Sequence, residues 1–259
     1  MAGSRTYRTN VIVLDKTKLK ETDLILTLLA ESGRQVRAVA KGARKPGSRL
    51  AARCELCCEV DLLLAHGRNL DVVSQADLLA APLGASASFE LLAAASAVAE
   101  VARHCSFEDA EDPFVYAITK AAFGALAGVE RERARCVAGD VAARLDVLVA
   151  AYVFKVLSHT GYRPDYSGCV ACGDEDVSRF SAMAGGLLCA SCATTVAGAV
   201  PVDAATVAWL RSLVGARFAE LAATPVDAAR GVQLLSLAHV WAATHLDCRL
   251  RALEFLLGR

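Results

Sequence analysis

Two cysteine pairs decide the fold of the second half of this chain: Cys169-Val170-Ala171-Cys172 and, after sixteen residues, Cys189-Ala190-Ser191-Cys192. Two C-x-x-C pairs at this separation are typical of four thiolates that bind one zinc ion. Glycines flank the first pair and precede the second, and they supply the positive φ angles that such turns need. We therefore predict one zinc ion, bound by Cys169, Cys172, Cys189 and Cys192. The alternatives are two disulfides or four unrelated buried thiols.

The predicted metal has a structural role. Four thiolates complete a tetrahedron and leave no open position for a reactive water molecule. A zinc deaminase would need an H-x-E motif and a proline before the first cysteine. Here Gly168 precedes Cys169, and no H-x-E occurs in the chain. The function must therefore be sought outside the cysteine pairs.

Composition indicates an intracellular protein, and its length allows one large domain or two to three small ones. The chain has 259 residues, of which 55% are hydrophobic, but no run of eighteen apolar residues that could span a membrane. The N-terminus lacks the apolar segment of a secretory signal. Ten cysteines without export point to the reducing cytoplasm. The six outside the zinc motif are expected to be buried as small hydrophobic side chains: Cys54, Cys57, Cys58, Cys105, Cys136 and Cys248.

Charge is distributed unevenly along a chain whose net charge is zero. Residues 1–50 contain eleven Lys and Arg against four Asp and Glu, so this part carries +7 and the remainder −7. A basic N-terminal module suggests a polyanion as its partner. The alternative is a solvated basic face without a partner.

The N-terminal module is predicted to be a small β-barrel. Apolar and alternating runs indicate five strands, at residues 10–14, 22–30, 35–41, 54–64 and 70–79. Residues 15–21 are expected to form a turn or loop, and residues 42–50 a basic loop without regular structure, because two glycines and a proline interrupt them. Five short strands remove their exposed edges by closing into a barrel. The pattern itself does not distinguish an OB-fold from an SH3-like barrel.

Helices are predicted after Pro82, where alanine and leucine dominate. We expect helices over Ser88–His104, from Asp112-Pro113 onward, over Asp140–Ser158 at the centre of the core, and from Pro201 and Asp203. Residues 226–257 are expected to form one long helix, with a broken helix as the alternative. Four aromatic residues lie at core positions of this part, although an exposed groove for a partner peptide is the alternative: Trp209, Phe218, Trp241 and Phe255. The predicted domains are residues 1–81 and 82–259, the second with a zinc hairpin at 167–195.

No catalytic motif is present. Gly42 and Gly47 have the spacing of a phosphate-binding loop, but Ser48 stands where that loop needs lysine. No nucleophile elbow or H-E-x-x-H motif occurs. The five histidines are scattered, and the carboxylates show no paired arrangement. We predict that the protein is not an enzyme.

The basic loop is the strongest functional candidate. Lys41, Arg44, Lys45 and Arg49 cluster within nine residues on a glycine-bearing backbone that we expect to be flexible. Such a loop can follow a phosphate backbone, with an affinity that falls steeply as salt rises. Tyr7 is the only aromatic residue before position 80, so we expect little sequence preference. A loop that only improves solubility is the alternative.

Three segments of the chain resemble the RecO family of bacterial DNA repair proteins. They are Glu21–Leu50, the turn Gly161-Tyr162-Arg163-Pro164 that leads to Cys169, and Leu250–Leu257. The resemblance covers nearly the whole chain and implies an α+β, multi-domain architecture: an N-terminal OB-fold barrel followed by an all-α domain with an inserted four-cysteine zinc hairpin.

The same resemblance implies a function in DNA repair and recombination. RecO proteins bind single- and double-stranded DNA and anneal complementary strands. With RecR, and often RecF, they load RecA onto DNA coated by single-strand-binding protein, whose acidic C-terminal tail they contact. The resemblance places the protein in the cytoplasm with the nucleoid. It assigns DNA contact to Lys41, Arg44 and Lys45, and more weakly to Arg34, Arg37 and Arg49.

Two rival functions follow from the residues. One is a zinc-stabilised adaptor that binds proteins and contacts nucleic acid only incidentally. The other is a transcription factor whose zinc ribbon reads DNA. The second is disfavoured because Arg179 is the only basic residue between Cys169 and Cys192.

Overall fold

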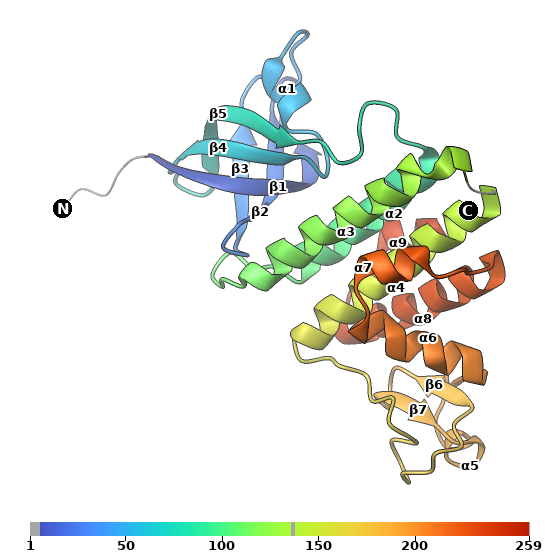
Figure 1. Ribbon diagram of the computed structural model, residues 1–259. Coiled ribbons are helices and arrows are strands. Elements are labelled where there is room, and N and C mark those ends of the chain that lie inside the picture. The colour runs from blue at the N-terminus through green and yellow to red at the C-terminus, as the bar shows by residue number, and fades with distance from the viewer. Residues whose placement is uncertain (1–5, 136–137, 259) are drawn as a thin grey trace. The chain divides into compact units, whose positions relative to one another are not determined.

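Five strands close into a barrel in the computed structural model (Figure 1). They are β1 (Thr6–Lys18), β2 (Leu24–Ala30), β3 (Gln35–Ala40), β4 (Glu59–Ala65) and β5 (Asp71–Ala80), arranged in the order β1-β2-β3-β5-β4. All neighbours are antiparallel except β3 and β5. A short helix, α1 (Arg49–Arg53), lies between β3 and β4 in the chain. A closed five-stranded barrel of this order is the OB-fold, which decides between the two barrel types that the sequence left open.

The structure describes residues 6–135 and 138–258, so Cys136 lies outside the described residues. The chain divides into two compact units, Met1–Ala127 and Gly128–Arg259. Together they confirm the α+β fold class, with a β-barrel followed by helices. None of the described helices has the length and apolar character that crossing a membrane requires.

β1 is longer than the sequence predicted. Its first half pairs with β4 and its second half with β2, and a bulge between Val13 and Asp15 lets the strand bend between them. Residues 15–18, predicted as a turn, therefore continue the strand. Polar side chains do not prevent this, because they project to the surface while the backbone pairs with Leu24–Thr27.

Two further predictions in the barrel are wrong. Residues 54–58 do not form a strand; the chain turns there, Cys57 has a φ of 65°, and β4 begins only at Glu59. Residues 49 and 50, which were expected to end an irregular loop, begin α1. The burial of Cys54, Cys57, Cys58 and Cys105 is confirmed, whereas Cys248 is half-buried.

The barrel core consists of side chains from alternate strand positions, as the period of a strand requires. It is lined mainly by branched apolar residues and alanines: Val11, Val13, Leu26, Leu28, Ala38, Ala40, Val60, Leu62, Leu64, Val73 and Ala76. Cys54 and Cys58 complete this core beside them. The closed, apolar interior fixes the strands and thereby the loops at the two ends of the barrel.

The compact first unit includes helix α2 (Phe89–His104), which contacts β1 and β2. The Gln35 amide donates hydrogen bonds to the carbonyl oxygens of Arg103 at 2.8 Å and Ser106 at 3.1 Å, at the C-terminal end of α2. Gly33 approaches the next helix, α3 (Pro113–Arg131), so closely that a Cβ atom there would lie 1.8 Å from the carbonyl oxygen of Asp112. The unit thus extends beyond residue 81, and the predicted domain boundary remains a prediction.

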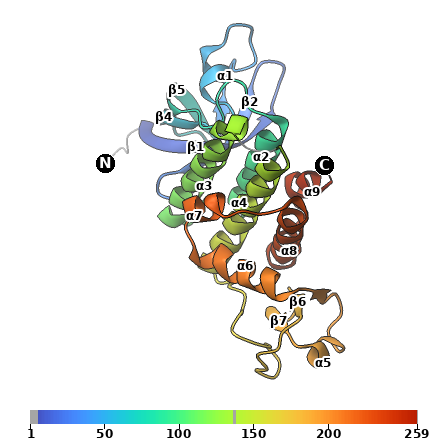
Figure 2. The same ribbon diagram turned by 45° about the vertical axis from the view of Figure 1, so that its right-hand side comes forward.

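The second unit is built around α4 (Ala138–His159), whose described side chains are buried on nearly all sides from Val141 to Leu157, as predicted. Against it pack α6 (Ala204–Gly215), α7 (Phe218–Ala223) and α8 (Ala228–Leu246) (Figure 2). Helix α7 was not predicted. The last predicted helix is divided, because Asp247 adopts a left-handed conformation with a φ of 47° before α9 (Arg251–Leu257).

The four aromatic residues assigned to the helical core differ in burial. Trp241 is fully buried, Trp209 and Phe218 are half-buried, and 57% of Phe255 is exposed. Core packing is therefore confirmed for Trp241 and is wrong for Phe255. Trp241 also packs against Phe180, with 5.7 Å between the ring centroids and a tilt of 45° between the rings, and this contact joins the cysteine-containing segment to α8.

That segment is a small three-stranded sheet with one helical turn. It contains β6 (Arg179–Ser181), β7 (Gly186–Leu188), α5 (Ala190–Ala193) and β8 (Val200–Pro201), with β6 in the middle of the sheet (Figure 2). A short η1 turn (Arg133–Arg135) precedes α4 in the chain.

Candidate nucleic-acid interface and metal centre

Exposed cations from two loops meet at one end of the barrel. The loop between β1 and β2 lies against the segment between β3 and α1: the Arg44 backbone N–H donates to the Thr22 carbonyl at 2.9 Å, and the Arg44 guanidinium donates to the Lys20 carbonyl at 2.9 Å. We call the exposed cations of these two loops and of the residues that flank them, Lys18 at the end of β1 and Arg49 at the start of α1, the cationic rim: Lys18, Lys20, Lys41, Arg44, Lys45 and Arg49. Four of its six members are residues that the sequence predicted for DNA contact.

The backbone of the rim is formed by hydrogen-bonded turns. Lys45 N–H donates to the Gly42 carbonyl at 3.1 Å, and Ser48 N–H donates to the Lys45 carbonyl at 3.1 Å. Gly42 and Gly47 take positive φ angles of 67° and 74°, which favour glycine. Residues 42–48 thus contain no helix or strand, as predicted, but these bonds order a backbone that the sequence suggested to be flexible.

Asp23 fastens the start of the rim. Its carboxylate accepts a hydrogen bond from the Gly42 N–H at 2.8 Å, and this bond is the main reason that the pKa of Asp23 lies below its usual value. The positive charges of Lys20 and Lys41 lower that pKa further.

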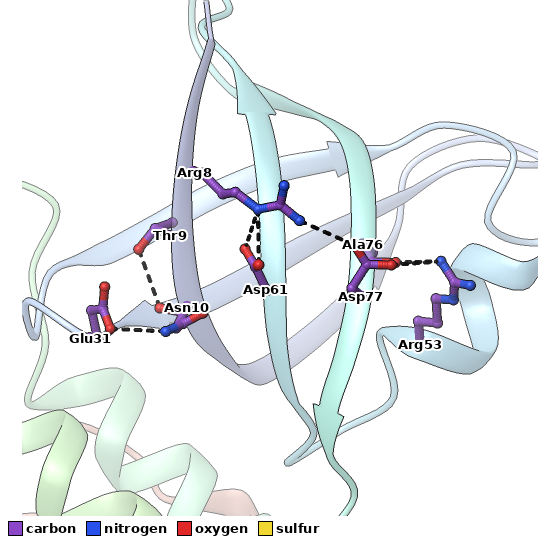
Figure 3. Close-up of polar contacts among 8 residues, drawn as sticks. All are labelled: Arg8, Thr9, Asn10, Glu31, Arg53, Asp61, Ala76 and Asp77. Carbon is purple, nitrogen blue, oxygen red and sulfur yellow. Dashed lines mark hydrogen bonds and ion pairs between the residues drawn. The ribbon is translucent and has the colours of Figure 1, made fainter.

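The other end of the segment is held by α1. Arg53 donates to the Ala76 carbonyl at 2.6 Å and pairs with Asp77 at 3.3 Å, while Arg8 pairs with Asp61 at 2.9 Å and Asp77 at 3.2 Å (Figure 3). Arg8 and Arg53 thus have carboxylate partners. Within residues 6–135 and 138–258, Lys41, Lys45 and Arg49 form no ion pair. Their charge is directed to solvent, where a phosphate can approach it.

The six predicted DNA contacts lie in three places along β3. Lys41, Arg44, Lys45 and Arg49 belong to the rim that follows β3. Arg37 is exposed within β3, where it pairs with Thr27 of β2. Arg34 lies at the other end, in the turn before β3, and is half-buried. The structure therefore does not bring Arg34 together with the rim.

Arg34 lines a cavity of about 350 Å³ at the mouth of the barrel. Tyr7 and His66 stack in its wall with their ring centroids 4.8 Å apart. The Tyr7 hydroxyl donates to Asp71 at 2.5 Å, and burial together with this bond raises the pKa of Tyr7 well above its usual value. The sequence did not single out His66 or Asp71, because each lies about sixty residues from Tyr7 and no local motif links them. The full lining is Tyr7, Arg8, Thr9, Ala30, Ser32, Arg34, Val36, His66 and Glu111.

The four predicted zinc ligands come together in the second unit. Their sulfur atoms all lie within 4.8 Å of one another, and those of Cys172 and Cys189 are 3.8 Å apart. Zinc–sulfur bonds of about 2.3 Å in a tetrahedron place the sulfurs about 3.8 Å apart, so the arrangement fits this ion. All four cysteines are free thiols, which agrees with neither the disulfide alternative nor four unrelated positions.

Backbone turns prepare the sulfurs for a cation. Hydrogen bonding from the Cys189 backbone, together with weaker bonds from Ala171 and Cys172, lowers the pKa of Cys169 to about 6. Hydrogen bonds with the neighbouring thiols, Cys172 first, raise the pKa of Cys192 to about 12. Four sulfurs this close cannot all ionise without a compensating positive charge, which a metal ion held by them would supply.

Comparison with known proteins agrees with this architecture. Residues 1–82 match the family described as Recombination protein O N terminal, and residues 86–254 match Recombination protein O C terminal. A relative from Bifidobacterium adolescentis, named DNA repair protein RecO, is 35% identical over 256 residues, which cover 96% of this chain and 98% of the relative. Proteins of the same name from Roseiflexus and Desulforudis audaxviator are 37% and 31% identical, over 81% and 97% of this chain and 70% and 96% of their own lengths.

RecO proteins are recombination mediators and not enzymes, in agreement with the prediction made from the sequence. The helical part, into which the cysteine cluster is inserted between α4 and α6, follows the barrel in the chain, as the second family match follows the first. The chain belongs to the RecO family of DNA repair and recombination proteins.

Proposed function

We propose that this protein binds single- and double-stranded DNA and anneals complementary strands. We further propose that, together with RecR and RecF, it loads RecA onto DNA coated by single-strand-binding protein, and that it contacts the C-terminal tail of that protein. The observation that carries the DNA-binding part is the cationic rim. The rim belongs to two hydrogen-bonded loops, and no acidic residue occurs from Lys41 to Arg53.

Annealing requires no bond chemistry. Two DNA strands repel each other, and cations that neutralise phosphates release counterions and hold both strands at high local concentration. Base pairing then selects the matching partner. A surface of fixed cations suits this task because it holds the phosphates and makes no demand on the sequence.

We propose zinc as the metal of the four-cysteine cluster, with a structural role. Cys169, Cys172, Cys189 and Cys192 would hold it, and the ion would balance four thiolates and bind the turn before β6 to the turn that starts α5. Four sulfur ligands leave no coordination position for substrate.

The rim is tested by changing Lys41, Arg44 and Lys45 together to alanine. We expect weaker binding of single-stranded oligonucleotides, and a plot of log affinity against log salt concentration whose slope is reduced by about two to three, near one for each lost phosphate contact. Annealing of complementary strands, with and without single-strand-binding protein, should slow in parallel. The measurement is a fluorescence titration over a salt series, followed by an annealing time course.

The matched control removes three exposed cations from the second unit: Arg163, Arg249 and Arg251. It changes the net charge by the same amount and should leave the salt slope within error of the wild-type value. If both triple variants behave alike, only net charge matters and the rim is not the site. If the unchanged protein neither binds nor anneals DNA at low salt, the adaptor function replaces this proposal.

A further inference from the structure

The cavity at the barrel mouth has the features of a small ligand site. Its volume of about 350 Å³ lies within the range of pockets that hold small molecules, and barrel mouths are a common place for them. Within it, the Tyr7 and His66 rings stack at an interplanar angle of 26°. More than half of the His66 side chain is exposed, so the stack is open to a third flat ring.

Asp71 holds the Tyr7 ring of this pair in place and lies near the His66 ring. It accepts the Tyr7 hydroxyl at 2.5 Å and the Gly67 N–H at 3.3 Å, and it lies 3.6 Å from the His66 ring nitrogen Nδ1. Only 16% of the Asp71 side chain is exposed. A largely buried carboxylate that holds the Tyr7 ring keeps this part of the platform ordered before any ligand arrives, which lowers the entropy cost of binding.

The charged groups around the platform are of both signs. Arg34 lines the cavity and, among the residues that the structure describes, forms no ion pair. Glu111 lines the same cavity and can accept hydrogen bonds from N–H groups. A fitting ligand therefore has a flat ring, an anionic group for Arg34 and N–H donors for Glu111. A DNA nucleotide combines these features, whereas inorganic phosphate lacks the ring.

Strand β3 connects the cavity with the cationic rim. Arg34 precedes β3, Arg37 is exposed within it and Lys41 follows it. The seven-residue step from Arg34 to Lys41 covers about 23 Å in an extended strand. A bound strand of several nucleotides can therefore run along β3 from the rim to the cavity, which agrees with the site sizes of about 4–16 nucleotides known for OB-folds.

We propose that the barrel-mouth cavity takes up one unpaired nucleotide of a bound DNA strand. Its base stacks on His66 and Tyr7, and its phosphate binds Arg34. The inference rests on the proposed DNA-binding function and adds to it a contact that requires an unstacked base. Duplex DNA cannot make this contact, so the cavity favours single strands over duplexes.

The test compares the full-length protein with its His66→Ala variant. Each is titrated with an oligothymidylate of about 12 nucleotides and with an abasic strand of the same length, which keeps the phosphates but has no bases. We expect the wild-type protein to bind the base-bearing strand about tenfold more tightly, since stacking of one base on an aromatic side chain has about this effect. His66→Ala should lose that preference while its affinity for the abasic strand and its salt slope stay unchanged.

Two further variants test the assignment. His66→Phe keeps a flat ring and should retain the preference for bases. Arg68→Ala, in the same turn but outside the cavity lining, should also retain it, even if its salt slope decreases by about one. A preference that survives in His66→Ala, or is absent from the wild-type protein, would overturn the proposal.

The outcomes separate this inference from the proposed function. If the wild-type protein binds both strands equally, the cavity assignment fails and the rim proposal stands. If it binds neither strand at low salt, the proposed function fails as well. A titration with deoxythymidine monophosphate completes the test. We expect the free nucleotide not to saturate the protein at concentrations at which the DNA strand does. If the free nucleotide binds as tightly as the strand, the assignment of the cavity to DNA is overturned.

Discussion

At the residue scale, Asp203 joins the start of α6 to α8. Its carboxylate accepts the Thr206 N–H at 2.7 Å as an N-cap and pairs with the Arg230 guanidinium at 2.8 Å. Hydrogen bonding to Arg230, followed by the bonds from Thr206, holds the pKa of Asp203 far below its usual value. A carboxyl group whose pKa is lowered on folding stabilises the protein above its unfolded pKa of about 4, and this contribution is lost as the pH falls toward the folded pKa.

Replacement of Asp203 by alanine should therefore lower the melting temperature at pH 7 by a few degrees. The difference from the wild-type protein should shrink as the pH decreases below about 4, because the wild-type carboxylate then becomes protonated. Asp203→Ser is the control: it keeps a capping hydroxyl, so its deficit at pH 7 should be smaller than that of Asp203→Ala. The difference in melting temperature between the two variants should be independent of pH, because neither has a carboxyl group at this position. Thermal melts from pH 7 to pH 3 measure both. An Asp203→Ala deficit that stays constant over this range would contradict the assignment.

At the scale of elements, the contact between α4 and α8 depends on Gly231. A Cβ atom at this position would lie 2.9 Å from the Ala143 Cα atom and 3.1 Å from its Cβ atom. Since both contacts are with rigid parts of α4, the Gly231→Ala side chain must push the helices apart. We expect a loss of about 1–3 kcal/mol in the free energy of unfolding, measured by urea denaturation.

Gly124→Ala is the matched control. Gly124 lies within α3, its φ is not positive, and no atom lies within 4 Å of a Cβ atom built there. The same substitution should there stabilise the protein, by up to about 1 kcal/mol, because alanine has the higher helix propensity. Opposite signs for the two variants would show that helix packing and not helix propensity governs position 231. A neutral Gly231→Ala would disprove the close contact.

At the scale of the whole molecule, the two candidate sites lie in different compact units: the rim in Met1–Ala127 and the cysteine cluster in Gly128–Arg259. We therefore expect loss of zinc to affect stability without affecting DNA binding. Cys172→Ser leaves three thiolates. Substitution of residues that only support metal ligands weakens metal binding by about 10–100-fold, so removal of a ligand itself should weaken zinc binding by more than this. Its melting temperature should fall by several degrees, while its affinity for single-stranded DNA stays within about twofold of the wild-type value.

Cys248→Ser is the control for this experiment, since Cys248 is half-buried and outside the cluster. It should keep the wild-type zinc content and melting temperature. Zinc is measured by metal analysis, stability by calorimetry and binding by fluorescence anisotropy. Unchanged zinc content in Cys172→Ser would refute the assignment of the ligands, and a parallel loss of DNA affinity would refute the independence of the two sites.

Local patterns in the sequence were enough to identify some of these features. The spacing of the cysteine pairs predicted a cluster that the structure forms, because C-x-x-C turns place both of their sulfurs on one side. Ser88, Pro113 and Asp203 marked the starts of helices, since caps and N-terminal prolines act within one turn. The basic loop could be recognised from the charges of its residues alone.

Other features depended on partners far away in the chain. The extension of β1 through Lys18 follows from backbone pairing with β2, which overrides its polar sequence. The ordered rim requires Asp23 and Lys20, about twenty residues from the atoms they hold. The Tyr7–His66–Asp71 group exists only because closure of the barrel joins the start of β1 to the turn between β4 and β5.

The sequence by itself thus determined the residue types, the charge, the metal-ligand spacing and the starts of several long helices. Only the tertiary structure decided which cations are paired and which face solvent, and that Arg34 lies at the barrel mouth apart from Lys41. The physical reason is the separation along the chain between the residues that interact. Helix caps and thiolate turns are satisfied within a few residues, whereas ion pairs and aromatic stacks form between segments that the closed barrel brings together.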